Sequence, residues 1–570
     1  MTVKYVSAIT LAAAMVNILG CQSQDEGRFD PRALGEQSRQ ASREVPSEPL
    51  RPLPTTLQSQ FMSDARDPNS PKEPPVRTPL APDNRIYRLP LREVVQRAVM
   101  NNLNVKVSGY QPAIEASRVT EAEARFDPEA FAGATYTANR NALGNLDPTR
   151  QSGQYDLIQL EAGIRQLLPS GGQIELAYKP GHYNQTSSQN TGFSNDAFWN
   201  PSLQLQLTQP LLRDFGNDIN RARIVINRLN QRISVLDWRK DLEEMMSNTE
   251  QVYWRLVQAE QDQQILERLL ERTIKTAEVL QARLKQDVTY EQVSNAVSRV
   301  ESSRADLIRA RQRVRDLSDQ LKALMNDPEF PTASNQLLLP ADQPLLSPVT
   351  FDMAESISTA LVNRFDIGQQ QLRVDSAAVA LDVAKNNRLP QLNLVGSIGT
   401  SGLGENAFSA TGNMFRGADD RGSDLNWSLG FQFSQKIGNR EANAIYRRAQ
   451  LQRLQAIEQY RGLIDNATLE VKVAQRDVET SWQSIGQSRA ARFAAAKALE
   501  VVETLERGGE ALVPRFVESK LNRQQDLAQS ERAEQDAIAQ YNIAIATLER
   551  RKGTLLRYNN VVIDEKAFKH

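Results

Sequence analysis

The stretch Leu203-Gln-Leu-Gln-Leu-Thr-Gln-Pro-Leu-Leu212, followed by Gly216, decides the fold because two periodicities meet there. Before Pro210, apolar leucines alternate with polar residues, which is the period of a β-strand. From Gly216 to residue 285 the chain has no proline and almost no glycine, which predicts one helix over 216–285. At 1.5 Å per residue this helix spans roughly 105 Å. The sequence therefore predicts a strand that leads directly into a helix of unusual length.

The second half of the chain repeats this succession. Trp427, Leu429, Phe431 and Phe433 alternate with polar or small residues, and a second long helix is predicted over 438–507. A shift of 262 residues aligns the openings of the two halves without a gap. The aligned pairs are Glu93 with Glu355, Ala98 with Ala360, Asn101 with Asn363 and Pro128 with Pro390. We therefore expect an internal twofold repeat, with copies over 86–326 and 349–563.

Each long helix is followed by a break and a return helix, predicted over 291–326 and 515–553. The first return helix has heptad spacing, which predicts a coiled-coil seam. The seam residues are Val293, Val300, Leu307, Val314 and Leu321, with Ala296, Ser303, Ala310, Leu317 and Leu324 three positions later. Another helix, over about 103–126, is expected to stack end to end with the return helix. Residues 327–348 contain five prolines and are predicted to form a non-helical connector at the equator of the helices.

Strands are predicted over 129–210 and 391–435. Alternation over about ten residues is typical of a transmembrane barrel strand, although one sheet of a soluble sandwich shows it too. Two helices of this length, each launched from a β-hairpin, favour the barrel. An additional alternating hairpin between residues 158 and 178 leaves the count open at four or six strands per chain. One chain has too few strands to close a barrel, so other subunits are expected to cover its edges.

Composition limits the chemistry that the chain can perform. Only two histidines and one cysteine occur, which nearly excludes His/Cys metal sites and Cys/His or Ser/His catalytic sites. The 68 Lys+Arg balance 69 Asp+Glu, which argues against a nucleic-acid binder. Carboxylates are spread along the helices as partners of Arg and Lys and form no pair at a defined cleft. No enzymatic activity, cofactor or metal is expected.

The first residues give the compartment. Lys4 and the apolar run from Tyr5 to Leu19 have the form of a signal peptide over 1–20, closed by Ile18-Leu19-Gly20-Cys21. This tetrapeptide resembles the lipobox of bacterial lipoproteins, which implies acylation of Cys21; a plain secretory signal is the alternative. Gln22 follows, where the resemblance implies that an aspartate often retains a lipoprotein in the inner membrane. Residues 21–85 are polar and proline-rich and are predicted to form a disordered tether. No further transmembrane helix is expected.

The order of these features resembles the TolC-type outer-membrane efflux proteins, in their lipoprotein subgroup, from Tyr87 to Ile563. No single motif is specific; their order, the repeat and the helix lengths together carry the resemblance. The motifs are Leu91-x-Glu93 with Ala98-x-x-Asn101-Asn102, Met353-x-Glu355 with Ala360-x-x-Asn363, Gln209-Pro-Leu-Leu212 with Gly216, Arg507-Gly-Gly509 with Phe516-Val-Glu-Ser-Lys520, and Tyr541 to Leu548 with Gly553.

The resemblance implies a mainly α fold with a membrane β-barrel. Three protomers would share one outer-membrane barrel, and their helices would form a coiled-coil barrel in the periplasm. The protein would be a passive exit duct of a tripartite efflux or type I secretion system. Its partners would be a periplasmic adaptor, an inner-membrane transporter of the RND, ABC or MFS type, and outer-membrane lipid, which also anchors it. The alternative is a non-channel coiled-coil lipoprotein that tethers parts of the envelope.

The helical tips are the candidate functional site. In the family they dock the adaptor and constrict the tunnel; ordinary helical turns are the alternative. The expected adaptor contacts are Asp287, Val288, Thr289 and Tyr290 in the first tip and Gly508, Gly509, Glu510, Ala511 and Leu512 in the second. The expected gate residues, which could also be solvated surface charges, are Arg283, Glu291, Arg507, Glu510 and Arg515.

Overall fold

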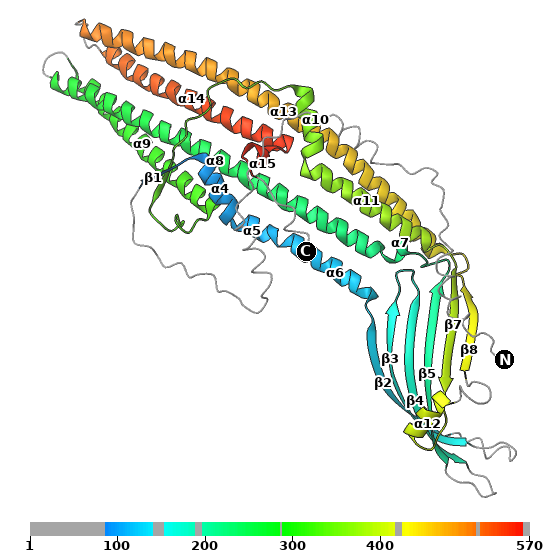
Figure 1. Cartoon of the computed structure of the whole chain (residues 1–570). Helices are drawn as coiled ribbons and strands as arrows, with labels where there is room; N and C mark the ends of the chain where they lie inside the picture. Colours follow the sequence, from blue (N-terminus) through cyan, green and yellow to red (C-terminus); the bar gives the residue numbers. More distant parts are fainter. Residues whose placement is uncertain are drawn as a thin grey trace. The chain divides into compact units, whose positions relative to one another are not determined.

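The computed structural model describes residues 86–140, 153–187, 196–284, 288–416, 425–508 and 514–561. The predicted signal peptide, Cys21, the tether, and tip residues Asp287 and 509–513 lie outside the described residues. The described part contains long paired helices and one large antiparallel sheet, as expected (Figure 1).

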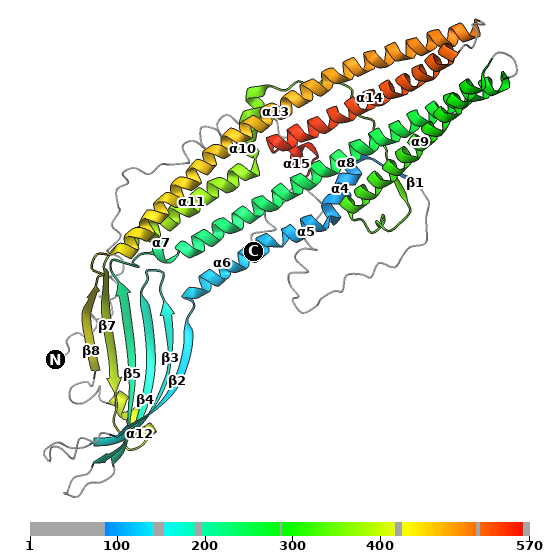
Figure 2. The ribbon, with the colours of Figure 1, turned by 180° about the vertical axis from the view of Figure 1, so that it is seen from behind.

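Two helical hairpins make up most of the helical part. Their four helices are α8 (Ala222–Ala282), α9 (Tyr290–Met325), α13 (Arg440–Arg507) and α14 (Pro514–Lys552). Helix α8 packs against α9, α13 packs against α14, and α14 also packs against α8, so that the hairpins lie side by side (Figure 2). In α9, most of the heptad residues are buried, among them Ala296, Val300 and Leu307. Within the described residues, no helix is both long and apolar enough to cross a membrane.

Shorter helices lie between the hairpins and the sheet. They are α4 (Leu91–Asn101), α5 (Leu103–Gly109), α6 (Gln111–Glu123), α7 (Asn217–Asn220), α10 (Met353–Asn363) and α11 (Phe365–Asn386). The helix expected over 103–126 is interrupted at Tyr110 and ends in a 3₁₀ turn, η1 (Ala124–Phe126). The interruption precedes Pro112, which has no N–H to donate and is tolerated only in the first turn of a helix. Short helices α6 and α11 both pack on α8, and α11 also packs on α13.

The sheet has six strands in the order β2-β3-β4-β5-β7-β8, and all neighbours are antiparallel. The strands are β2 (Glu129–Arg140), β3 (Gly153–Leu167), β4 (Gln173–Ser187), β5 (Asp196–Pro210), β7 (Gln391–Ser401) and β8 (Leu425–Ser434). The additional hairpin therefore joins the sheet as β3 and β4. Between β7 and β8, within the range 391–435 in which strands are predicted, lies a helix that the sequence analysis does not include, α12 (Ala407–Arg416).

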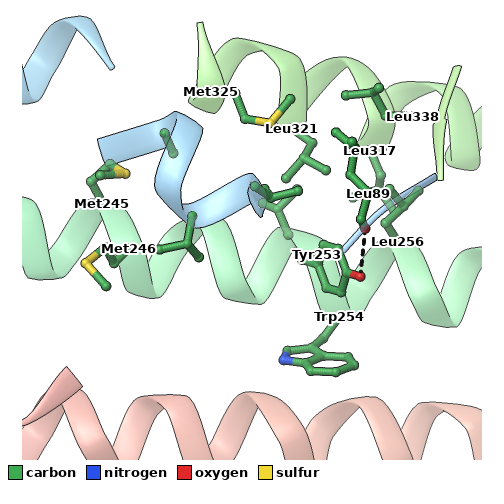
Figure 3. Close-up of a cluster of buried hydrophobic side chains, with 14 of the residues drawn as sticks. Leu89, Met245, Met246, Tyr253, Trp254, Leu256, Leu317, Leu321, Met325 and Leu338 are labelled. Atoms are coloured by element: carbon green, nitrogen blue, oxygen red, sulfur yellow. Dashed lines mark hydrogen bonds between the residues drawn. The ribbon is translucent and has the colours of Figure 1, made fainter. Parts of the chain in front are cut away.

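A second, small sheet joins the connector to the start of the first copy, near the middle of α8. Strand β1 (Ile86–Leu89) pairs in parallel with β6 (Leu337–Pro340), which lies within the proline-rich connector. Fully buried Tyr253 of α8 anchors this pair. Its hydroxyl donates to Leu89 O at 3.0 Å (Figure 3). It also accepts from the backbone N–H groups of Ala341 and Asp342. Tyr253 belongs to the largest cluster of buried apolar side chains, with leucines and methionines of α8, α9 and β6, so the principal core of the helical part lies here (Figure 3). The last helix, α15 (Leu555–Tyr558), closes this core.

Candidate functional site: a two-faced sheet and two helical tips

The two faces of the large sheet differ in chemistry. Paired residues on antiparallel strands share a face, so the register assigns every side chain to one of the two. One face, called here the apolar face, carries Tyr136, Ile158, Leu160, Ile164, Leu176, Leu203, Leu205, Leu207, Ile398, Trp427, Leu429, Phe431 and Phe433. Most of these side chains are exposed, Trp427 at 73%. An exposed apolar surface that crosses all six strands is far larger than a soluble monomer normally shows.

The opposite, polar face carries glutamines, serines and charged residues. Gln204 and Gln206 of β5 lie there with Ser428 and Gln432 of β8. Two cross-strand ion pairs are also on this face: Arg165 with Glu129 at 2.9 Å and Lys179 with Glu161 at 2.8 Å. The polar face is therefore suited to water, and the apolar face is suited to hydrocarbon.

Aromatic residues mark both ends of the apolar face. At the end remote from the helices, Tyr136, His182 and Trp199 lie in one row across paired strands, with Ile158 between them. At the helical end, Phe431 pairs with Leu394, which pairs with Gln209 of β5. The ten residue steps from Trp199 to Gln209 span about 33 Å along the strand, which would correspond to about 25 Å in height at the usual barrel tilt of about 40°. This is the height of the apolar band of an outer-membrane barrel.

The edges of the sheet are open in this single chain. Among the described strands, β2 and β8 each pair on one side only. All ten residues of β8 are exposed. One of the two longest helices is also largely uncovered: only eight side chains of α13 are buried, against 24 on α8. The uncovered surface of α13 includes the exposed apolar side chains of Leu451, Leu454, Leu469 and Phe493.

The described residues of the first tip have different exposures. Val288 is buried in a cluster with Leu280 of α8 and with Val517 and Leu521 of α14, so it joins the two tips from the inside. Thr289 caps α9 in a capping box: its N–H donates to Gln292 Oε1, and its Oγ1 accepts from Gln292 N. Tyr290 is 77% exposed and is the large apolar surface of this tip.

The second tip is described at Gly508, which caps α13, and from residue 514 onwards. Four expected gate residues are described. Glu291, Arg507 and Arg515 are exposed and Arg283 is half-buried. Arg507 pairs with Glu503 of its own helix at 3.8 Å. Glu510 lies outside the described residues. A nearby pair that the sequence did not suggest, Lys520 with Glu506 at 2.6 Å, joins α14 to α13.

No family model and no curated protein matches the sequence. Solved structures match over most of the chain. The outer-membrane channel CmeC of Campylobacter jejuni is 16% identical, with a TM-score of 0.57 over 84% of this chain and 90% of that chain. The outer-membrane protein VceC of Vibrio cholerae is 16% identical, with a TM-score of 0.57 over 81% and 96%. The open MtrE outer-membrane channel of Neisseria gonorrhoeae is 14% identical, with a TM-score of 0.56 over 85% and 98%.

The chain has the fold of a TolC-type outer-membrane channel. Solved structures that share this fold include outer-membrane channels. The described residues contain no group of three or more His, Cys, Asp or Glu side chains that could hold a metal ion.

Two buried carboxyls lie where α15 packs on α8. Glu250 is 2% exposed and accepts a hydrogen bond from Asn559 Nδ2 at 2.5 Å. Glu243, two turns earlier, is also buried, and its Oε1 has no hydrogen-bond partner among the described residues. Burial raises the pKa of both carboxyls from the usual 4.5 to about 7. These residues cannot be recognised from the sequence, because two glutamates in a charged helix look like solvated surface residues.

These raised pKa values predict that acid stabilises the α8–α15 contact. Between about pH 4.5 and 7 the folded chain holds protons that the unfolded chain has lost, so stability falls as pH rises and levels off above about 7. We expect Glu250→Gln to reduce this pH-dependent loss of unfolding free energy by up to about 3 kcal/mol, since the pKa shift of about 2.5 units corresponds to about 1.36 kcal/mol per unit. Thermal unfolding from pH 5 to pH 8 measures this. The exposed Glu278→Gln on the same helix is the control, and equal pH profiles for both variants would contradict the assignment.

Proposed function

We propose that this chain is one protomer of a trimeric outer-membrane channel, the passive exit duct of a tripartite efflux or type I secretion system. A periplasmic adaptor would couple the channel to an inner-membrane transporter of the RND, ABC or MFS type, which supplies the energy and selects the cargo. The observation that carries the proposal is the two-faced sheet: its apolar face has the height of a bilayer's hydrocarbon band and aromatic residues at both ends. Solute would pass along the polar face, which carries glutamines, serines and ion pairs.

Open edges favour closure by copies of the same chain. A lipid-exposed strand with unpaired backbone groups is too costly to persist in a bilayer, so β2 and β8 need partners. Strand β2 runs away from the helices and β8 runs toward them, so β8 of one copy and β2 of the next meet antiparallel. Three copies of six strands give a barrel of 3 × 6 = 18 strands, the size of barrel that leaves an aqueous channel. The open surface of α13 would meet the neighbouring protomer in the same head-to-tail arrangement.

The internal repeat supports a tunnel built from six similar units. Helices α4 and α10 have the same length, 11 residues, and begin 353 − 91 = 262 residues apart. Each is followed by a helix that leads into the sheet and by a long helix that leads out of it. Three chains would therefore present six related hairpins to the periplasm.

Membrane attachment would be reinforced by a lipid on Cys21, with Gln22 permitting sorting to the outer membrane. Two signals, a barrel and an acyl anchor, would hold the protein in this membrane. Wild-type protein labelled with radioactive palmitate should carry the label, and Cys21→Ala should lose it. A label that persists in Cys21→Ala would contradict lipidation at this residue.

The tips would dock the adaptor and form the gate. Exposed Tyr290 and the second tip, Gly508 to Leu512, would offer the contact, while Thr289 fixes the start of α9 and Val288 holds the two tips together. Asp287 completes the first tip. Charged residues at both tips, Arg283, Glu291, Arg507, Glu510 and Arg515, would surround the threefold axis, where like charges of three copies set ion preference.

Removing a tip carboxylate should change conduction if it lies at the axis. We expect Glu510→Ala to alter the single-channel current and the ion preference in planar bilayers, because three negative charges leave the constriction together. Glu500→Ala is the matched control, since Glu500 is exposed and pairs with Lys497 on the same helix. Unchanged currents in Glu510→Ala would remove this residue from the gate.

The orientation of the sheet can be tested at two adjacent residues. Leu205 is on the apolar face of a central strand, and Gln204 is on the polar face. An arginine at the centre of the lipid face costs about 2–4 kcal/mol, so Leu205→Arg should reduce the detergent-stable trimer in the outer-membrane fraction. Gln204→Arg should leave the trimer intact and shift ion preference. Equal recovery of both trimers, or protein released from the envelope by salt as a monomer, would favour the tether and contradict the channel.

A further inference from the structure

Helix α12 packs closely against the sheet because two glycines leave room for its backbone. Gly402 and Gly404 follow β7, and a Cβ at Gly402 would lie 2.1 Å from the carbonyl oxygen of Ala410. A Cβ at Gly404 would lie 2.6 Å from Ala410 N. Ala410 and Met414 are consequently buried against the strands. The helix thus packs closely on the sheet, at the end remote from the long helices (Figure 1).

The contacts place α12 on the apolar face. Tyr178 shares that face with Leu203, and its hydroxyl lies 2.8 Å from Thr411 Oγ1. Thr400 also pairs with Leu203 and donates through Oγ1 to Met414 O at 3.0 Å. Helix α12 therefore covers the side of the sheet that the proposed channel turns to lipid, and not the polar side.

The outer surface of α12 carries two phenylalanines. Phe408 is 91% exposed and Phe415 is 63% exposed. They are seven residues apart, which puts them on one side of a helix. Ala410 and Met414 occupy the opposite side, against the sheet. A helix with one side packed on the sheet and an exposed aromatic side is typical of an element that lies at a membrane interface.

We propose that α12 lies in the outer leaflet of the membrane, on the outside of the barrel, with Phe408 and Phe415 among the acyl chains. This inference rests on the proposed function, because it needs the apolar face in lipid. A neighbouring protomer is the less suitable occupant: α12 packs on β5 and β7 in the body of the sheet, whereas neighbours join at β2 and β8. Ile398 and Leu205 are exposed on the same face of the sheet, next to the row of residues that α12 contacts. The two phenylalanines extend this exposed apolar surface.

Photo-crosslinking of the full-length protein tests the proposal. p-Benzoylphenylalanine is placed at Phe408, at Leu205 as a lipid-facing reference and at Gln432 as a control on the polar face. Each variant is reconstituted as a trimer in vesicles of phosphatidylethanolamine and phosphatidylglycerol, illuminated and analysed by mass spectrometry. We expect lipid adducts at position 408 in a yield comparable with that at position 205, and no lipid adduct at position 432.

The three positions separate the possible failures. Lipid adducts at 205 with protein adducts, or none, at 408 would overturn the assignment of α12 and leave the proposed channel standing. Absence of lipid adducts at both 205 and 408 would overturn the membrane position of the whole sheet, and the proposal for α12 with it. A crosslink from 408 to a second copy would identify α12 as a subunit contact instead of a lipid contact.

Discussion

Unpaired backbone groups at the two edges of one sheet are the constraint on which the rest of this structure depends. A six-stranded sheet with an exposed apolar face is not stable alone in water, and in lipid its edges β2 and β8 cannot remain open. Both difficulties are removed together when identical sheets join edge to edge. The proposed barrel would then turn its apolar face to hydrocarbon and its glutamine- and serine-rich face to a water-filled lumen.

The helices differ in the same way: one is enclosed by its neighbours and another has an open surface. Helix α8 is held on several sides by α9, α14, α11 and α6, and its middle carries the core around Tyr253. Helix α13 has only eight buried side chains, and its remaining surface includes exposed leucines and Phe493. The protomer thus has a well-packed interior and an open flank that continues the open edge of β8. A head-to-tail ring covers such a flank without any new secondary structure.

Much of this architecture can be read from the sequence, because it depends on local periodicity. Leu203, Leu205 and Leu207 fix the strand and its apolar face, and the heptads of α9 fix the side that becomes buried. Features that depend on distant pairing are not visible in this way. The β1–β6 pair joins residues about 250 positions apart, and α12 is a helix of only ten residues that contains a glycine, so its own sequence is a weak helix signal. Val288 looks like a free tip residue in the sequence, but contacts from α14 bury it.

The edge-to-edge closure can be measured most directly by disulfide scanning between β2 and β8 in a Cys21→Ala background. Cysteines at Ala132 or Ala134 of β2 are combined with cysteines at Leu429 or Phe431 of β8, all on the apolar face. Neighbouring same-face positions of paired strands are near enough for a disulfide, and opposite-face positions are not. The account predicts disulfide-linked dimers and trimers for same-face pairs, and none when Gly430 of the polar face replaces Leu429. Crosslinks only within one chain, or equal crosslinking for both faces, would contradict the shared barrel.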